Sequence, residues 1–229
     1  MPRFGAPPKK EAPRALVDAS SPYAEPFRAL RLALGLRNPG QKPRAILVTS
    51  PNLQEGKSTV AGNLAWVASA AQRVLLMDCD VRQPVQHTRF GLQRSPGLVD
   101  LFAENDASFS NHVQSARGLH VLTAGRSMLS AADLMSSPRM GELIDSALES
   151  YNLVVLDSPP ILAVADGLGL ASKPHVDTVL VVSPTTRRRA IRSAIRELEL
   201  VDANIAGVVA NKFGRLPTAY GYGYNAGAA

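Results

Sequence analysis

Short apolar runs alternate along this chain with longer segments in which apolar residues recur at helical spacing. Helices are expected from Ser21 to the Asn38-Pro39-Gly40 stop signal and over residues 58–71, 136–150 and 187–201. Six runs rich in Val, Leu and Ile predict strands over residues 45–49, 74–77, 119–123, 153–156, 178–182 and 205–209. Strands that are apolar on both faces are typical of a parallel sheet covered by helices. The pattern therefore predicts an α/β fold with a doubly wound, mainly parallel sheet.

The 229 residues suit one domain of this class, with different composition at each end. Residues 1–20 are rich in Pro, Ala and charge and predict a flexible N-terminal arm. Residues 21–216 form the expected domain. Residues 217–229 combine tyrosine with glycine and predict a flexible tail. No apolar run approaches the roughly 20 residues that would cross a bilayer.

Charge and cysteine content narrow the classes of partner and compartment. The net charge is +6, but the 25 basic residues are spread out, and Arg187-Arg188-Arg189 is the one tight cluster. Aromatic residues make up only 5% of the chain and do not interleave with basic ones, so no nucleic-acid partner is expected. A solvated basic face is favoured, and attraction to acidic lipid head groups stays open. Cys79 is the single cysteine, which excludes an internal disulfide and fits a reducing cytoplasm.

A phosphate-loop sequence, Glu55-Gly56-Lys57-Ser58-Thr59, lies between a predicted buried strand and a helix of small residues. In this context backbone N–H groups and the helix N-terminus face phosphates, Lys57 reaches their outer oxygens, and Ser58 binds Mg²⁺. The loop lacks some of the usual glycines: Pro51 stands six positions before Lys57, and Gln54 lies inside the turn. A left-handed Gln54 would cost roughly 1–2 kcal/mol. The residues expected to bind ATP are Glu55, Gly56, Lys57, Ser58, Thr59, Arg82 and Asn211.

Three carboxylates follow predicted strands at the edge of the sheet where this loop lies. Alternation along a strand sends Asp78 and Asp80 to the same side. Asp157 directly follows the predicted strand over residues 153–156. Converging carboxylates repel unless a cation or a proton lies between them. The expected metal ligands for Mg²⁺ are Ser58, Asp80 and Asp157. A substrate hydroxyl could supply a proton to Asp78.

These segments resemble the Walker A, A′ and B elements of the bacterial tyrosine kinases of capsule and exopolysaccharide assembly. The resemblance covers residues 50–59, 75–82 and 154–160 most closely and implies a P-loop NTPase type of fold. It implies an ATP-dependent protein-tyrosine kinase that regulates polysaccharide synthesis and export. Catalysis would depend on Asp78 as acceptor of the tyrosine proton, together with Lys57 and Asp80. How the three carboxylates divide these roles stays open.

The same resemblance implies self-association and a phosphoacceptor. Glu25, Arg28 and Arg31 match the family's Glu-x-x-Arg-x-x-Arg segment, which joins kinase domains into a ring. The tail matches its C-terminal tyrosine cluster, which is phosphorylated between subunits; the candidate acceptors are Tyr220, Tyr222 and Tyr224. The implied partners are a membrane activator (a polysaccharide co-polymerase with a cytoplasmic tail) and a phosphotyrosine phosphatase. The chain resembles the stand-alone cytoplasmic branch, held at the inner face of the membrane through its partner.

Two alternatives remain at this stage. A partitioning or cell-division-positioning ATPase would share the fold, but it carries a second lysine five residues before Lys57, where this chain has Asn52. A catalytically weak or inactive nucleotide-binding subunit of the same export assembly is the other alternative, and Gln54 is its main support.

Overall fold

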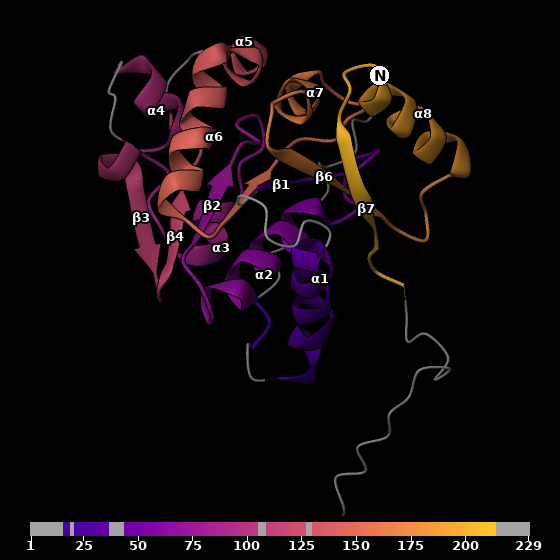
Figure 1. Ribbon diagram of the computed structural model, residues 1–229, viewed down its shortest axis with the longest axis horizontal. Coiled ribbons are helices and arrows are strands. Elements are labelled where there is room, and N and C mark those ends of the chain that lie inside the picture. Colours follow the sequence, from indigo (N-terminus) through magenta and orange to yellow (C-terminus); the bar gives the residue numbers. More distant parts are fainter. Residues whose placement is uncertain (1–15, 19–20, 37–43, 105–108, 127–129, 214–229) are drawn as a thin grey trace, which may run out of the picture.

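A computed structural model describes residues 16–18, 21–36, 44–104, 109–126 and 130–213. Within these residues a seven-stranded sheet has the order β3-β4-β2-β5-β1-β6-β7 (Figure 1). The strands are β1 (Ala45–Thr49), β2 (Val74–Asp78), β3 (Val113–Ala116), β4 (Leu119–Leu122), β5 (Leu153–Asp157), β6 (Val176–Val182) and β7 (Asn204–Ala210). All neighbouring pairs are parallel except β3 with β4. The predicted fold class is thereby confirmed.

The six predicted strands are all present, and β3 is the strand that the sequence prediction missed. It pairs antiparallel with β4 at the edge of the sheet, and its residues are only half-buried or exposed. A short edge strand needs no continuous apolar run, so Val113–Ala116 carries little of the signal that identified the others.

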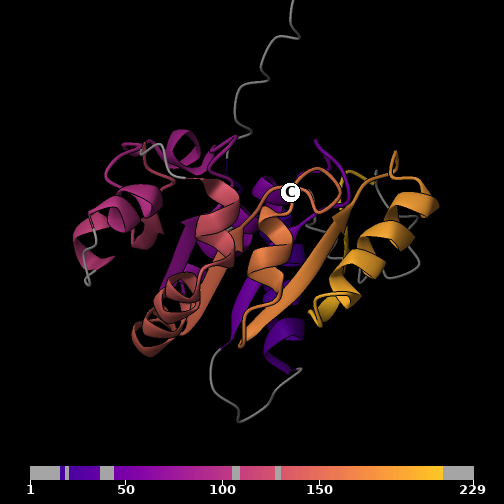
Figure 2. The ribbon, with the colours of Figure 1, turned by 90° about the horizontal axis from the view of Figure 1, so that it is seen from above.

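Helices cover the two faces of the sheet (Figures 1 and 2). Phe27 of α1 and Val60 and Leu64 of α2 pack on one face. Met140 and Ile144 of α6 and the apolar side of α8 pack on the other. The α-helices are α1 (Glu25–Leu36), α2 (Lys57–Ser69), α3 (Gln86–Phe90), α4 (Leu98–Ala103), α5 (Ala131–Ser136), α6 (Pro138–Ser150), α7 (Asp166–Ala171) and α8 (Arg188–Glu199).

The predicted helix over residues 136–150 is shorter in the structure because a separate helix precedes it. Ser137 has an extended backbone, and its hydroxyl accepts a hydrogen bond from the Met140 N–H at 3.2 Å. Pro138 occupies the first position of α6, where its missing N–H removes no intrahelical bond. The short helices α3, α4, α5 and α7 were not predicted, since five or six residues show too little periodicity.

Several predictions fall partly or wholly outside the described residues. These are the stop signal Asn38-Pro39-Gly40, most of the N-terminal arm and the whole 217–229 tail. Within the predicted arm, Val17 contacts α2: its N–H donates to Asn63 Oδ1 at 2.9 Å, and its carbonyl accepts from Trp66 Nε1 at 3.1 Å.

Candidate active site

The phosphate loop joins β1 to α2 at the carboxyl end of the parallel strands. Gly56 precedes α2 with φ +96°, a backbone conformation that residues other than glycine rarely adopt. A Cβ atom at this position would lie 2.0 Å from Asn211 Nδ2. That amide follows β7 and donates to the Glu55 carbonyl at 3.0 Å. Asn211 therefore holds the loop backbone, and its predicted contact with the nucleotide base stays a prediction.

Gln54 has a left-handed backbone, with φ +63°. This is the conformation for which the sequence predicted a strain of roughly 1–2 kcal/mol. Lys212 compensates in part, because its Nζ donates to the Gln54 carbonyl at 2.7 Å. The sequence prediction missed Lys212, which has no motif of its own beyond its place next to Asn211.

The Glu55 side chain is buried and braces the loop from inside. Its carboxylate accepts hydrogen bonds from the N–H and Nδ2 of Asn52, at 3.0 and 3.1 Å, and from Thr186 Oγ1 at 2.7 Å. Since this carboxylate is occupied within the protein, the predicted contact of Glu55 with a nucleotide falls to its backbone N–H. Asn52, which stands where partitioning ATPases have a second lysine, has a structural role here.

The Lys57 ammonium forms an ion pair with Asp80, with 2.8 Å between Nζ and Oδ2. It also donates to Ser58 Oγ at 3.2 Å. Burial by itself lowers the pKa of Lys57, but the carboxylates of Asp157 and Asp80 outweigh burial and raise the pKa above its ordinary value. Lys57 is therefore a firmly charged cation among acids.

Asp78 and Asp157 are neighbours at the ends of β2 and β5, where their Cα atoms are register partners. Both side chains are fully buried. Burial raises the pKa of Asp78 well above its usual range, and the negative charge of Asp157 raises it further. Burial likewise raises the pKa of Asp157, opposed by the charge of Lys57. The strand-alternation argument does not extend to Asp80, because β2 ends at Asp78.

Gln86, at the start of α3, connects the two buried acids. Its side-chain amide donates to Asp157 Oδ2 at 2.7 Å and to the Ser58 carbonyl at 3.0 Å. Its backbone N–H donates to Asp78 Oδ2 at 2.9 Å, beside the Val85 N–H at 3.1 Å. The sequence prediction missed Gln86, since a buried glutamine a few residues past the acidic segment matches no motif.

The arrangement fits a magnesium ion. Asp78 Oδ1 and Asp157 Oδ1 are buried oxygens without a hydrogen-bond partner, although each carboxylate's other oxygen is satisfied. Among the described residues no group of three or more His, Cys, Asp or Glu side chains could hold a metal alone. The two unpartnered Oδ1 atoms are the observation that suits Mg²⁺, which binds through one or two carboxylates and takes its other oxygens from phosphates and water. Ser58 contacts Lys57 and Gln86 of this group, and its role as a metal ligand stays a prediction.

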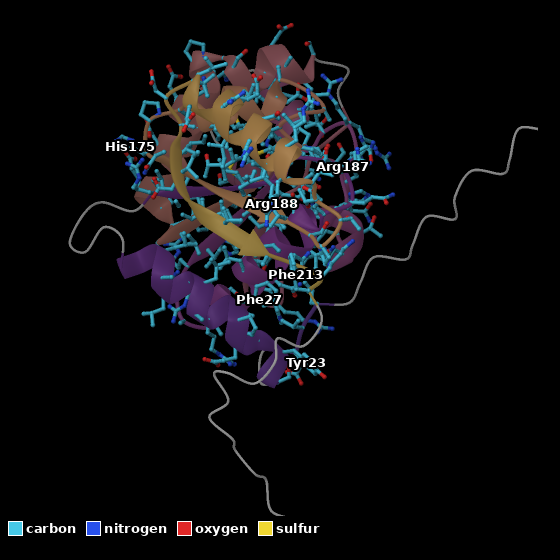
Figure 3. The ribbon with its side chains drawn as sticks, turned by 90° about the vertical axis from the view of Figure 1, so that its right-hand side faces the viewer. Tyr23, Phe27, His175, Arg187, Arg188 and Phe213 are labelled. Carbon is cyan, nitrogen blue, oxygen red and sulfur yellow. The ribbon has the colours of Figure 1, made fainter. Side chains whose placement is uncertain are left out.

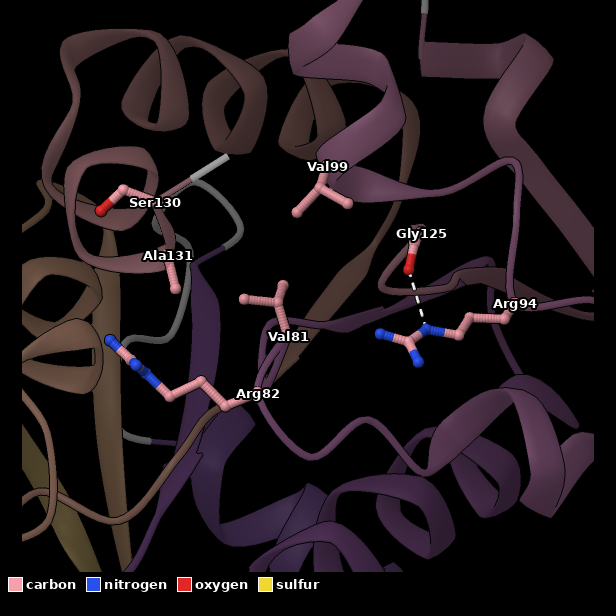
Figure 4. A pocket seen from close by; sticks show the side chains of 7 residues that line it. All are labelled: Val81, Arg82, Arg94, Val99, Gly125, Ser130 and Ala131. Atoms are coloured by element: carbon pink, nitrogen blue, oxygen red, sulfur yellow. Dashed lines mark hydrogen bonds between the residues drawn. The ribbon is translucent and has the colours of Figure 1, made fainter. Parts of the chain in front are cut away.

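Arg82 forms a bidentate ion pair with the buried Asp166 of α7, with distances of 2.7 and 3.1 Å. The predicted contact of Arg82 with a nucleotide stays a prediction. Beside it lies a pocket of about 290 Å³ (Figure 4). Two valines and one alanine line it together with two arginines, and Arg94 donates from Nε to the Gly125 carbonyl at 2.9 Å. The lining residues are Val81, Arg82, Arg94, Val99, Gly125, Ser130 and Ala131.

The remaining predicted residues are Thr59, the charged residues of α1 and the tyrosines of the tail. Thr59 Oγ1 accepts from Arg89 at 3.1 Å. Glu25 and Arg28 form an exposed ion pair of 2.8 Å on α1, which also carries Arg31. The three candidate acceptor tyrosines lie beyond residue 213, in the part that the structure does not describe.

Comparisons with known proteins give close relatives in sequence and structure. No protein-family model matches the chain. It is 32% identical over 200 residues to the tyrosine-protein kinase YwqD of Bacillus subtilis, covering 86% of this chain and 84% of YwqD. It is 38% identical over 208 residues to EpsB of Ralstonia nicotianae, covering 89% of this chain but 27% of EpsB. The chain thus spans about a quarter of the length of that relative.

Solved structures agree with the sequence matches. The kinase domain of the Escherichia coli tyrosine kinase ETK matches with a TM-score of 0.78 and 29% identity, covering 88% of this chain and 80% of that domain. The chimerical protein CapA2B2 matches with a TM-score of 0.76 and 29% identity, covering 86% and 87%. A plasmid partition protein from Borrelia burgdorferi, 15% identical with a TM-score of 0.56, shares the fold alone.

Proposed function

Since this chain belongs to the family of bacterial tyrosine kinases, we propose that it transfers a phosphoryl group from ATP to protein tyrosine. The observation that carries the proposal is the buried pair Asp78 and Asp157, each with an unpartnered oxygen, beside Lys57 at the start of α2. A partitioning ATPase is disfavoured by the same comparisons, because the likeness to a partition protein is limited to the fold.

The roles follow from where each group lies. Lys57 and the N-terminal turn of α2 bind the phosphates, and Asn211 orients the base end of the nucleotide. Ser58, Asp157 and Asp80 would hold Mg²⁺, which supplies charge neutralisation at the transferring phosphoryl group. Asp78 accepts the proton of the tyrosine hydroxyl. Burial beside Asp157 makes Asp78 a stronger base than an ordinary aspartate once it has lost its proton.

Nucleotide entry changes the partner of Lys57. In the described state its charge is neutralised by Asp80. Phosphate oxygens would replace that carboxylate at Lys57, and Asp80 Oδ2 would become available as a ligand for Mg²⁺, while Asp80 Oδ1 accepts a hydrogen bond from the Gln83 N–H at 3.1 Å. Proton acceptance, phosphate binding and cation binding thus occur within one connected set of side chains.

The acceptors are Tyr220, Tyr222 and Tyr224 of a second copy of the chain. Glycine between them leaves each tyrosine free to enter an active site in turn. The pocket between Arg82 and Arg94 lies next to the Asp78–Arg82 segment, and its two valines and its alanine would contact an approaching aromatic segment. Phosphates accumulating on neighbouring tails would repel and loosen the assembly.

Self-association would use the Glu25, Arg28 and Arg31 side of α1, where charged groups are exposed. Among the described residues, none of the helices qualifies as a membrane span by its length and hydropathy. On the family resemblance, we place the kinase at the inner face of the membrane through an activator with a cytoplasmic tail, with a phosphatase reversing the reaction. The process served is capsule or exopolysaccharide synthesis and export.

Two complementary variants test transfer between copies. The acceptor is Lys57→Met, which keeps its tyrosines, and the donor carries phenylalanine at positions 220, 222 and 224. Mixed with magnesium-ATP, they should yield phosphotyrosine on the acceptor, mapped by mass spectrometry, whereas the acceptor alone stays unlabelled. Hydrolysis of ATP without labelled tyrosine would overturn the kinase proposal. Nucleotide binding with neither activity would instead support the inactive-subunit alternative.

A further inference from the structure

Helix α8 presents a basic surface that the proposed catalytic cycle does not use. Five arginines at its N-terminal side and along its length are exposed: Arg187, Arg188, Arg189, Arg192 and Arg196. Figure 3 shows Arg187 and Arg188 on the face of the molecule where α8 and β7 lie. Within the described ranges none of the five makes a salt bridge, although acidic side chains are available elsewhere on the surface.

The spacing turns these arginines into a continuous stripe. Arg188, Arg192 and Arg196 are four residues apart and lie on one side of the helix. At 1.5 Å of rise per residue their Cα atoms extend over roughly 12 Å of the surface. Glu199, the last residue of α8, lies at the C-terminal end of this stripe. Leu200, which follows it, is 77% exposed.

This placement opposes the local stability of the helix. The first turn of α8 contains no acidic residue, and its basic residues face the positive end of the helix dipole. Like charges four residues apart also repel each other. Each of these two effects destabilises the isolated helix slightly. Negatively charged phosphates next to the arginines would turn both effects into a stabilisation of α8.

We propose that α8 lays this stripe, defined by Arg188, Arg192 and Arg196, against the acidic head groups of a lipid bilayer. Guanidinium groups bind phosphate by their planar fork. An exposed row of arginines along one side of a helix suits a plane of many phosphates better than a single bound anion. Helix α8 has no aromatic residue on which a base could stack, which disfavours single-stranded nucleic acid.

The contact gives the chain an affinity for the membrane surface that is separate from any activator. Arg187 and Arg189 add charge at the end of the stripe, and exposed Leu200 adds an apolar contact at the other end. Each basic residue near an anionic surface contributes about 1 kcal/mol. Loss of two arginines should therefore weaken vesicle binding roughly thirtyfold.

The test compares two double variants of the full chain with equal loss of charge. Arg188→Gln with Arg192→Gln removes the stripe, and glutamine preserves helix propensity. Arg73→Gln with Arg117→Gln is the control, at exposed sites away from α8: Arg73 precedes β2, and Arg117 lies in the turn between β3 and β4. Partition is measured by sedimentation with phosphatidylcholine vesicles, with and without one-third phosphatidylglycerol, at about 0.1 M salt.

We expect the unaltered chain and the control to bind the anionic vesicles within about threefold of each other, and the stripe variant to bind roughly thirtyfold more weakly. Its thermal midpoint should be unchanged or higher, which separates lost binding from lost folding. Equal losses in the two variants, or no preference for anionic vesicles, would overturn the proposal. Binding of soluble polyglutamate by the same arginines without vesicle binding would also overturn it, in favour of an acidic protein partner.

Discussion

The Nζ atom of Lys57 lies 2.8 Å from Oδ2 of Asp80, and both side chains are largely buried. This ion pair joins the residue that would bind phosphate to one that would bind the cation. Because a buried charge without a partner is costly, neither group can change its environment alone. Binding of nucleotide and of Mg²⁺ should therefore be coupled, with Asp80 as the link.

Asp80→Asn is expected to uncouple nucleotide binding from Mg²⁺ binding. Lys57 would lose its competing carboxylate, and incoming phosphates would meet one negative charge fewer. Affinity for ATP without Mg²⁺ should rise on the order of tenfold, about 1.4 kcal/mol. Phosphotransfer with Mg²⁺ should fall roughly 10²-fold or more, because a metal ligand is lost. Fluorescent-nucleotide titration with and without Mg²⁺ measures the first effect.

Asp133→Asn, at an exposed site on α5, is the matched control and should change neither quantity. If Asp80→Asn leaves the affinity for ATP without Mg²⁺ unchanged or lowers it, the ion pair between Lys57 and Asp80 does not oppose nucleotide binding.

Gln54 and Lys212 should behave as a coupled pair. Gln54→Gly removes the left-handed strain of roughly 1–2 kcal/mol and should tighten nucleotide binding. Lys212→Met removes the hydrogen bond to the Gln54 carbonyl and should weaken binding by roughly 0.5–1.5 kcal/mol. In the Gln54→Gly background the Lys212→Met effect should shrink, because a glycine needs less support. Calorimetric titration of the four chains gives the coupling energy.

The control for this cycle is Lys173→Met. Lys173 donates to two backbone carbonyls, those of Ser136 and Ser137, and it follows α7 rather than the phosphate loop. Its loss should leave nucleotide affinity unchanged. Strictly additive effects of Gln54→Gly and Lys212→Met would mean that Lys212 does not hold the strained turn.

Most of the fold could be predicted from the sequence, because the buried strands are continuous apolar runs. What it missed has physical reasons. The edge strand β3 is half-exposed, and α3 and α4 are too short for periodicity. In the site, Asp78 and Asp157 end β2 and β5, the strands that the apolar runs predicted. Gln86 and Lys212 were not predicted, because each acts on a partner that only the fold brings near: Gln86 on Asp157, 71 residues away, and Lys212 on Gln54, 158 residues away.

Gln86→Met tests whether this amide positions the buried acids. Methionine has a similar shape but cannot donate, so Asp157 Oδ2 and the Ser58 carbonyl each lose a partner. An unsatisfied buried acceptor costs roughly 1–3 kcal/mol. We expect a lower free energy of unfolding by that amount in urea denaturation, and weaker Mg²⁺ dependence of phosphotransfer. Gln83→Met, at an exposed site nearby, should have the same free energy of unfolding and the same Mg²⁺ dependence as the unaltered chain. If Gln86→Met also shows no change, the Gln86 amide is not needed to position the buried acids.

The raised pKa of Asp78 makes the stability of the nucleotide-free protein depend on pH. In the unfolded chain this carboxyl loses its proton near pH 4, whereas burial and the charge of Asp157 keep it protonated to a higher pH in the folded state. Between the two pKa values the folded state binds more protons, so stability falls as pH rises. Asp78→Asn mimics the protonated form and can still accept from the two backbone N–H groups. It should match the unaltered chain at pH 5 and melt higher at pH 8, by roughly 2–4 °C for each kcal/mol gained.

Mg²⁺ with nucleotide should narrow the difference at pH 8, because the cation stabilises the ionised form. Asp78→Asn should nevertheless abolish phosphotransfer, so that the more stable chain is the inactive one. Thermal melts across this pH range, with Asp133→Asn as control, give the result. A variant that melts lower than the unaltered chain at pH 8 would show that the ionised Asp78 is stabilised by the fold, and it would remove the argument for Asp78 as a base activated by burial.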